Sequence, residues 1–127
     1  MITEDYVSYE VAKLLKEKGF DEECYDFYEV EYAIPSKKHS QRNKSVNWNG
    51  EEENCYSAPT HQMACAWLRE VHHIHIAVNP IAHKGYIAII YDVADFDDYG
   101  IVSDTECYFH PEEAVEAALK FALENLI

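Results

Sequence analysis

Hydrophobic residues recur at helical spacing in three separate stretches of the chain. The first stretch begins at Ser8, whose hydroxyl can accept a hydrogen bond from a free N–H of the first turn, and ends at Gly19. The second begins at Thr60, directly after Pro59, and the third begins at Pro111, where the missing N–H of proline costs nothing. In each stretch the apolar side chains form one stripe, so we predict three amphipathic helices.

Between the predicted helices, hydrophobic and polar residues alternate with period two, the spacing of a strand with one buried face. The pattern predicts strands over 24–34, 74–79 and 85–93, and an edge strand within 101–109. Pro35 and Pro80 are expected to end the first two strands. The stretch 85–93 is almost continuously apolar, which is typical of a central strand.

The stretch 36–57 is the least regular part of the chain. It begins basic and becomes acidic, and its Val46-Asn47-Trp48 segment has strand character before an Asn-Gly pair that suits a hairpin turn. A structureless loop of this length is uncommon in a compact domain. We therefore expect either a hidden strand here or an irregular, mobile insertion.

Together these elements predict a single α+β domain over residues 1–127. Its expected architecture is an antiparallel sheet of three to five strands, with the three helices packed mainly on one face. A chain of 127 residues has the size of one domain. The residues expected in the core are Val11, Leu14, Leu15, Met63, Trp67, Ile76, Ile89, Val115, Leu119 and Ala122.

Charge narrows the classes of partner. The chain has 24 Asp and Glu against 10 Lys and Arg, a net charge of −14. Such a surface repels nucleic-acid phosphates and anionic membranes, so we expect neither as a partner and consider a basic protein compatible. The acidic start differs from a signal peptide, and no stretch has the roughly 18 apolar residues of a membrane helix, so a cytoplasmic location is expected.

The sequence contains no motif of a known catalytic or cofactor site. The four cysteines (Cys24, Cys55, Cys65 and Cys107) form no C-x-x-C pair, and we expect them to be reduced. No glycine-rich phosphate loop, nucleophile elbow or Cys-His signature is present. The sequence therefore favours a protein that is not an enzyme, and it predicts no catalytic residue and no organic cofactor.

Three histidines lie within four residues after the second predicted helix. On a strand, His73 and His75 would point to the same side about 7 Å apart, which suits two ligands of a divalent metal. Glu70 could add a carboxylate, and His61 or His83 a third imidazole. Because no known ligand spacing completes the set, the alternative is that these histidines line the solvent-facing side of a strand.

Acidic and tyrosine side chains are candidates for contact with a protein partner. The acids between 92 and 106 include no Lys or Arg among them, and their spacing does not match a calcium loop, so a solvated turn is the alternative. Tyrosines are frequent in or beside the predicted strands, and tyrosine both fills half-buried sheet surfaces and is enriched at interfaces. The candidate partner-binding residues are Asp92, Asp95, Asp97, Asp98, Tyr28 and Tyr32.

Two segments carry a resemblance to a known group of proteins. Residues 57–72 read Ser-Ala-Pro-Thr-His-Gln-Met-Ala-Cys-Ala-Trp-Leu-Arg-Glu-Val-His, and residues 111–120 read Pro-Glu-Glu-Ala-Val-Glu-Ala-Ala-Leu-Lys. Together they resemble a family of small proteins from gut bacteria, their phages and mobile elements, and Trp67-Leu68-Arg69-Glu70 is the most specific part. The resemblance covers most of the layout, although 36–57 matches no pattern and His110-Pro111 replaces a Ser-Tyr or Thr-Tyr entry.

That family has no known activity, so the resemblance implies no catalytic residues. It implies a small accessory protein encoded by a phage or mobile element. Our leading hypothesis is a non-enzymatic protein that acts through protein contacts. A second hypothesis is a metal-binding protein or metal-dependent enzyme that uses His73, His75 and Glu70. A third is a DNA mimic that inhibits a host DNA-binding protein through the acids of 92–106.

Overall fold

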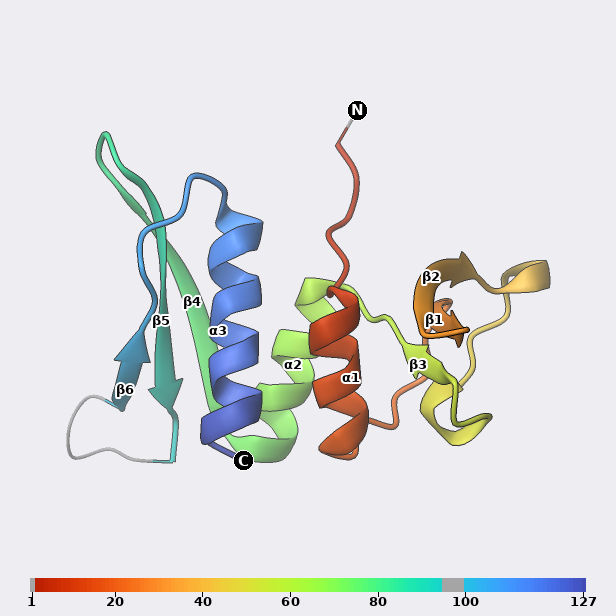
Figure 1. Cartoon of the computed structure of the whole chain (residues 1–127). Coiled ribbons are helices and arrows are strands. Elements are labelled where there is room, and N and C mark those ends of the chain that lie inside the picture. Colours follow the sequence, from red (N-terminus) through yellow and green to blue (C-terminus); the bar gives the residue numbers. More distant parts are fainter. Residues whose placement is uncertain (1, 95–99) are drawn as a thin grey trace. The chain divides into compact units, whose positions relative to one another are not determined.

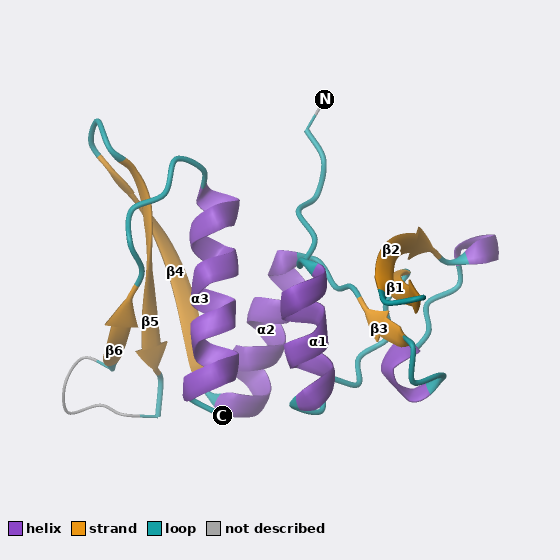
Figure 2. Cartoon of the chain, viewed as in Figure 1, coloured by secondary structure: helices purple, strands orange, loops and turns teal. Residues whose placement is uncertain are grey.

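The computed structural model describes residues 2–94 and 100–127, and the chain forms two compact units, 1–60 and 61–127 (Figure 1). In chain order the elements are α1 (Tyr9–Glu17), β1 (Asp26–Glu31), β2 (Ile34–His39), a 3₁₀ turn (Gln41–Asn43), a second 3₁₀ turn (Trp48–Gly50), β3 (Cys55–Ser57), α2 (His61–His72), β4 (Ile74–Ile81), β5 (Gly85–Asp92), β6 (Ile101–Asp104) and α3 (Pro111–Asn125). The predicted α+β class is confirmed. The described strands form two three-stranded antiparallel sheets instead of one sheet (Figure 2).

Helix α1 begins and ends where the sequence predicts. The Ser8 hydroxyl accepts a hydrogen bond from the Val11 N–H at 3.2 Å. At the other end Gly19 takes a positive φ of 91°, a conformation that ends helices and that glycine adopts without steric penalty. Val11 and Leu15 are buried, and Phe20 packs back into the core directly after the helix.

The first sheet has the strand order β2-β1-β3. The predicted single strand over 24–34 is wrong, because the chain reverses at Tyr32 and Ala33 and returns as β2. Both turn residues have positive φ, 52° and 64°, as in the tight hairpin turns that normally contain Asn and Gly. Pro35 lies within β2 opposite Val30, which is possible because β2 is an edge strand.

The stretch 36–57 contains the rest of β2, the two 3₁₀ turns and β3. Val46 forms an isolated bridge with Cys24 through two backbone hydrogen bonds of 2.9 and 3.0 Å. The Asn-Gly pair at 49–50 lies in the second 3₁₀ turn rather than in a hairpin turn. Backbone hydrogen bonds thus hold this irregular stretch against β1 and Cys24.

The second sheet has the order β4-β5-β6, and α2 and α3 pack on one of its faces (Figure 1). In the register Ile76 lies opposite Ile90, and Val78 lies opposite Ala88. Ile76, Ile90 and Ala88 are buried against the helices. Pro80 does not end β4, since the pairing with β5 continues to Ile81 opposite Gly85. None of the described helices is long and apolar enough to cross a membrane.

The predicted core is only partly correct. Six of its members are buried: Val11, Leu15, Trp67, Ile76, Leu119 and Ala122. Leu14, Ile89 and Val115 are partly exposed, and Met63 is 37% exposed. Strand β5 is central in its sheet, as predicted, but the helices cover only one of its faces, so Ile89 lies on the opposite side from Ala88 and Ile90.

Candidate functional site

A buried carboxylate at the start of β1 gathers three side chains from the first unit. The Asp26 side chain is only 8% exposed; its Oδ1 contacts Nδ1 of His39, and its Oδ2 lies 3.2 Å from Nζ of Lys37. Tyr6 forms a side-chain hydrogen bond with the same carboxylate, and burial followed by the charge of Asp26 raises the pKa of Tyr6. The Lys37 ammonium also lies 3.5 Å from the centroid of the Tyr6 ring, so two cations and a phenol surround one anion.

The imidazole of His39 has an oxygen acceptor at each ring nitrogen. Nδ1 faces the Asp26 carboxylate, and Nε2 lies 3.2 Å from Oδ1 of Asn43. The ring can satisfy both acceptors only by donating from both nitrogens, which requires the imidazolium form. The hydrogen bond to Asp26, followed by that to Asn43, accordingly raises the pKa of His39. His39 therefore carries a positive charge and donates from both ring nitrogens, to Asp26 and to Asn43.

A pocket of about 510 Å³ lies beside this cluster. Its apolar wall is formed by Phe27 and Trp48, whose rings stack with centroids 3.9 Å apart and planes 20° apart. The Trp48 indole N–H donates to the Cys24 carbonyl at 2.8 Å, which fixes the ring. His39 and Lys44 also line the pocket, so it combines a flat apolar wall with basic side chains.

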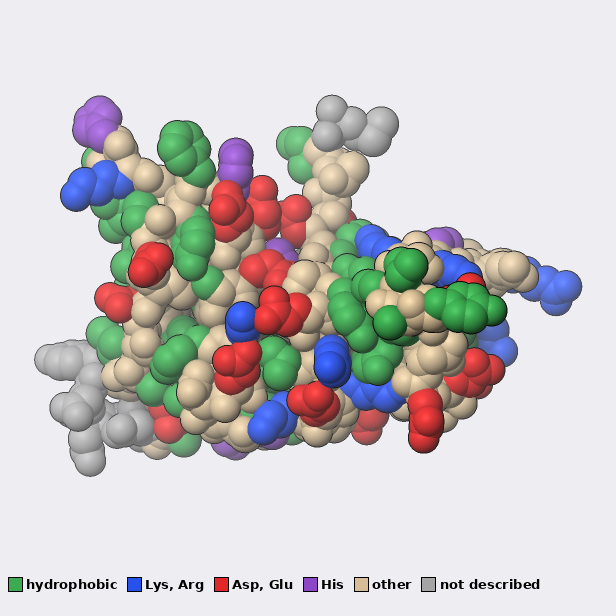
Figure 3. Space-filling model, viewed as in Figure 1, with side chains coloured by type: hydrophobic (Ala, Val, Ile, Leu, Met, Phe, Trp, Pro, Cys, Tyr) green, Lys and Arg blue, Asp and Glu red, His purple; other side chains and the backbone are tan. Residues whose placement is uncertain are grey.

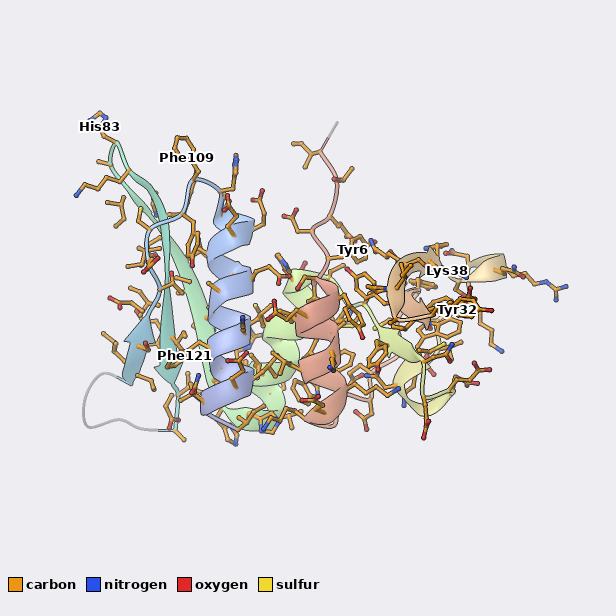
Figure 4. The ribbon with its side chains drawn as sticks, viewed as in Figure 1. Tyr6, Tyr32, Lys38, His83, Phe109 and Phe121 are labelled. Atoms are coloured by element: carbon orange, nitrogen blue, oxygen red, sulfur yellow. The ribbon has the colours of Figure 1, made fainter. Side chains whose placement is uncertain are left out.

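One ion pair is part of the pocket lining. Lys38 Nζ lies 2.7 Å from Glu29 Oε1. The hydrogen bond between them lowers the pKa of Glu29 and raises that of Lys38. Four of the ten Lys and Arg residues of the chain lie between 37 and 44. Figure 4 labels Lys38 among the side chains of the first unit.

A second candidate surface is the side of the β4-β5-β6 sheet away from α2 and α3. We call it the open face and define it by His75, Ala77, Ile87, Ile89, Tyr91, Ile101 and Asp104, which the register places on one side of the sheet. Ile87, Ile89 and Tyr91 are half-buried, and Ile101 is 54% exposed. In Figure 3 hydrophobic and acidic side chains lie next to one another over β5 and β6.

The proposed metal ligands lie on different parts of the chain's structure: Glu70 on α2, His73 between α2 and β4, and His75 in β4. His73 precedes β4 and has a positive φ of 60°, so it does not share the alternation of the strand with His75. His75 lies on the open face with its ring 6.1 Å from that of Tyr91, whereas Glu70 is exposed on α2 beside Arg69. In the described part of the chain, no group of three or more His, Cys, Asp or Glu residues could hold a metal ion.

The two other histidines considered as third ligands lie elsewhere. His61 Nε2 is 2.9 Å from Oε1 of Glu116, which joins the start of α2 to α3. His83 lies at the tip of the β4–β5 hairpin with a φ of 63° (Figure 4). Neither His61 nor His83 joins His73 and His75 in a group of described residues that could hold a metal ion.

The predicted partner-binding residues occupy different surroundings. Asp92 ends β5 opposite Ile74, and its carboxylate accepts a hydrogen bond from the Ala94 N–H at 3.0 Å. Asp95, Asp97 and Asp98 lie outside the described residues. Of the acids between 92 and 106 that the structure describes, Asp104 is part of the open face and Glu106 follows β6; both are exposed.

Tyr28 and Tyr32 do not share one strand face, because Tyr28 lies within β1 whereas Tyr32 lies in the turn that follows it. The Tyr28 hydroxyl donates to the Val7 carbonyl at 2.7 Å, and its ring packs edge-on against Tyr9 with centroids 5.7 Å apart. Tyr32 is 98% exposed at the tip of the β1–β2 hairpin. Tyr28 thus stabilises the first unit. Of these two tyrosines, Tyr32 is the one whose whole side chain is exposed to solvent.

The four cysteines are free thiols. Burial raises the pKa of Cys24 to about 12 and that of Cys65 to about 11, and it also raises the pKa of Cys55. Only Cys107 is exposed. Cys24 and Cys55 are buried and Cys65 is partly exposed. A protonated thiol is a poor nucleophile, so the structure gives the buried Cys24 and Cys55 a packing role and makes Cys65 weakly reactive.

Sequence reasoning missed the Asp26 cluster and the pocket. The signal that could have found them is the basic run between 37 and 44 followed by Trp48, an unusual concentration of positive charge in an acidic chain. No protein-family model, no curated protein and no solved structure matches the chain. The resemblance carried by residues 57–72 and 111–120 stays an expectation, and function has to be inferred from geometry.

Proposed function

We propose that the protein acts by binding another protein through the open face, without catalysing a reaction. The observation that carries this proposal is the apolar row formed by Ile87, Ile89 and Tyr91 on the side of the sheet that α2 and α3 leave uncovered. The exposed face of an antiparallel sheet is usually polar. An apolar row at this position favours an interaction surface.

The strands on both sides extend this apolar row. Ala77 lies opposite Ile89 on β4, and Ile101 lies opposite Tyr91 on β6. Removing apolar surface from water contributes roughly 25 cal/mol per Å², so a partner that covers these side chains gains affinity from their burial. His75 and Asp104 give the surface polar groups that can fix the orientation of a partner.

Charge specifies the chemistry of the partner segment. Residues 61–127 contain eleven Asp and Glu against three Lys and Arg. Asp104 lies opposite Ile89 in the register, so a carboxylate lies directly beside the apolar row. The expected partner segment therefore combines aliphatic or aromatic side chains with Lys or Arg. Complementary charge of this kind raises the association rate and excludes acidic competitors.

A selection from a random peptide library tests this proposal. The library is panned on the wild-type protein after depletion on the Ile89→Lys variant, which adds a charge at the centre of the open face. We expect enriched peptides to contain apolar residues next to Lys or Arg. No enrichment over the depleted library, or enrichment of acidic peptides, would overturn the proposal.

A matched variant controls for the added charge. Val71 is 53% exposed on α2, so Val71→Lys makes the same chemical change away from the open face. Selected peptides should bind Val71→Lys like the wild type. A DNA mimic would behave differently, because its complexes depend on acids alone: binding would disappear at high salt and would be insensitive to the Ile89 substitution.

A further inference from the structure

The pocket belongs to the first unit and the open face to the second, and the proposed protein binding does not use the pocket. We propose that this pocket binds a small organic anion that carries a flat ring. The apolar wall of Phe27 and Trp48 would hold the ring, and the ammonium of Lys44 would bind the anionic group, with Lys38 and His39 as further basic residues of the lining. The volume of about 510 Å³ lies within the usual range of small-molecule sites, about 300–1,000 Å³.

The charges that line the pocket favour an anion. Lys38 and Glu29 neutralise each other across 2.7 Å. The lining contains Lys38, Lys44 and His39 against Glu29 and Glu51, so it carries one net positive charge when the His39 imidazole donates from both nitrogens.

The two other charged residues of the lining, Lys44 and Glu51, do not form an ion pair with each other. Lys44 and Glu51 both line the pocket, and both are exposed. Lys44 forms no ion pair or hydrogen bond with the described residues, so its ammonium is available to a ligand. The pocket lining thus has one net positive charge, and Lys44 is a flexible cation within it, in a protein whose net charge is −14.

Most of the lining is held in place without a ligand. The Trp48 ring is fixed by its hydrogen bond to the Cys24 carbonyl and by stacking on Phe27. His39 is held by Asp26 and Asn43. Because these side chains are already ordered, binding a ligand does not incur the entropic cost of immobilising them. This is the main advantage of a preformed site.

An NMR titration of the full-length protein tests the inference. The probes are phenyl phosphate and indole-3-acetate, each of which joins a ring to an anion; inorganic phosphate and benzyl alcohol supply the anion or the ring alone. We expect saturable shifts of the Trp48 indole N–H and of the backbone amides of Gln41 and Lys44. At least one ring-bearing anion should bind tenfold or more tightly than both half-probes.

Two variants locate the site. Lys44→Gln removes the flexible cation from an exposed side chain and should weaken binding at least fivefold with no change in the rest of the spectrum. Lys84→Gln, an exposed lysine of the second unit, should leave the affinity unchanged. The inference is overturned if neither ring-bearing anion gives saturable shifts at Trp48, if benzyl alcohol binds equally well, or if Lys44→Gln has no effect. None of these outcomes bears on peptide binding at the open face, so the two proposals fail independently.

Discussion

Asp26 and His39 form a cross-strand pair that joins β1 to β2 through their side chains as well as through the backbone ladder. The pair closes the end of the hairpin opposite to the Tyr32–Ala33 turn, and Lys37 contacts the same carboxylate from two residues earlier on β2. An edge strand whose six residues are all exposed depends on such contacts, because it buries little apolar surface.

The first prediction concerns the pH dependence of stability. The pKa of His39 is raised in the folded state above its ordinary value of 6.5 by the hydrogen bonds to Asp26 and Asn43. Its contribution to the free energy of unfolding is therefore complete below pH 6.5 and is lost as pH rises through the folded pKa. We expect denaturant unfolding to show a stability difference between wild type and His39→Gln that is large at pH 5.5 and small at pH 9. A difference independent of pH would contradict this account.

The second prediction concerns the turn between β1 and β2. Ala33 has a φ of 64°, which penalises any residue with a Cβ. Ala33→Gly should raise the free energy of unfolding by about 1 kcal/mol, because glycine adopts this conformation without strain. The matched control is Ala117→Gly in α3, which should lower stability by about 1 kcal/mol. Thermal or urea unfolding measures both, and two losses of equal size would rule out a strained turn.

The third prediction compares two glycines with positive φ. A Cβ on Gly85 would lie 2.1 Å from the Tyr108 carbonyl oxygen, whereas a Cβ on Gly19 would have no heavy atom within 4 Å. Gly19→Ala should therefore lower the free energy of unfolding by about 1 kcal/mol through backbone strain alone. Gly85→Ala should lower it by about 3 kcal/mol, because the backbone at residue 85 must also move away from Tyr108, which disturbs the bridge between Tyr86 and Tyr108. Urea unfolding at 25 °C gives both values; a smaller loss for Gly85→Ala would contradict the close approach.

The fourth prediction concerns thiol reactivity. Burial raises the pKa values of Cys24, Cys55 and Cys65, so little thiolate is present at pH 7.5. Iodoacetamide should label the exposed Cys107 first, the partly exposed Cys65 more slowly, and the buried Cys24 and Cys55 only as the protein opens. Mass spectrometry of digests taken at successive times measures the order. Labelling of Cys24 or Cys55 as fast as that of Cys107 would contradict the burial of these thiols.

The helices could be predicted because residues at their ends have a known preference for those positions. The first sheet could not be predicted because its hairpin turn contains no such residue. Ser8, Gly19 and Pro111 are residues whose chemistry favours a helix end wherever they occur. The β1–β2 turn has no such marker, since Tyr32 and Ala33 are neither Asn nor Gly. Once that turn was missed, the register that brings Asp26 opposite His39 could not be derived, and the cluster and the adjoining pocket were missed with it.

The division of the strands between two sheets had a different cause. Period-two alternation shows that a stretch is a strand but not which strand it pairs with. The alternation also left open which face of β5 the helices cover, because both Ile89 and Ile90 are apolar. The sequence therefore predicts Ile89 in the core, whereas it lies on the open face to which we assign the proposed function.

The most direct test of that function is the affinity of one selected peptide for three proteins, measured by fluorescence polarisation at low and moderate salt. If the open face binds the peptide, Ile89→Lys should weaken binding at least tenfold, and Val71→Lys should bind like the wild type. The loss should persist at moderate salt, because buried apolar contact is not screened. Equal affinity for all three proteins would contradict the account.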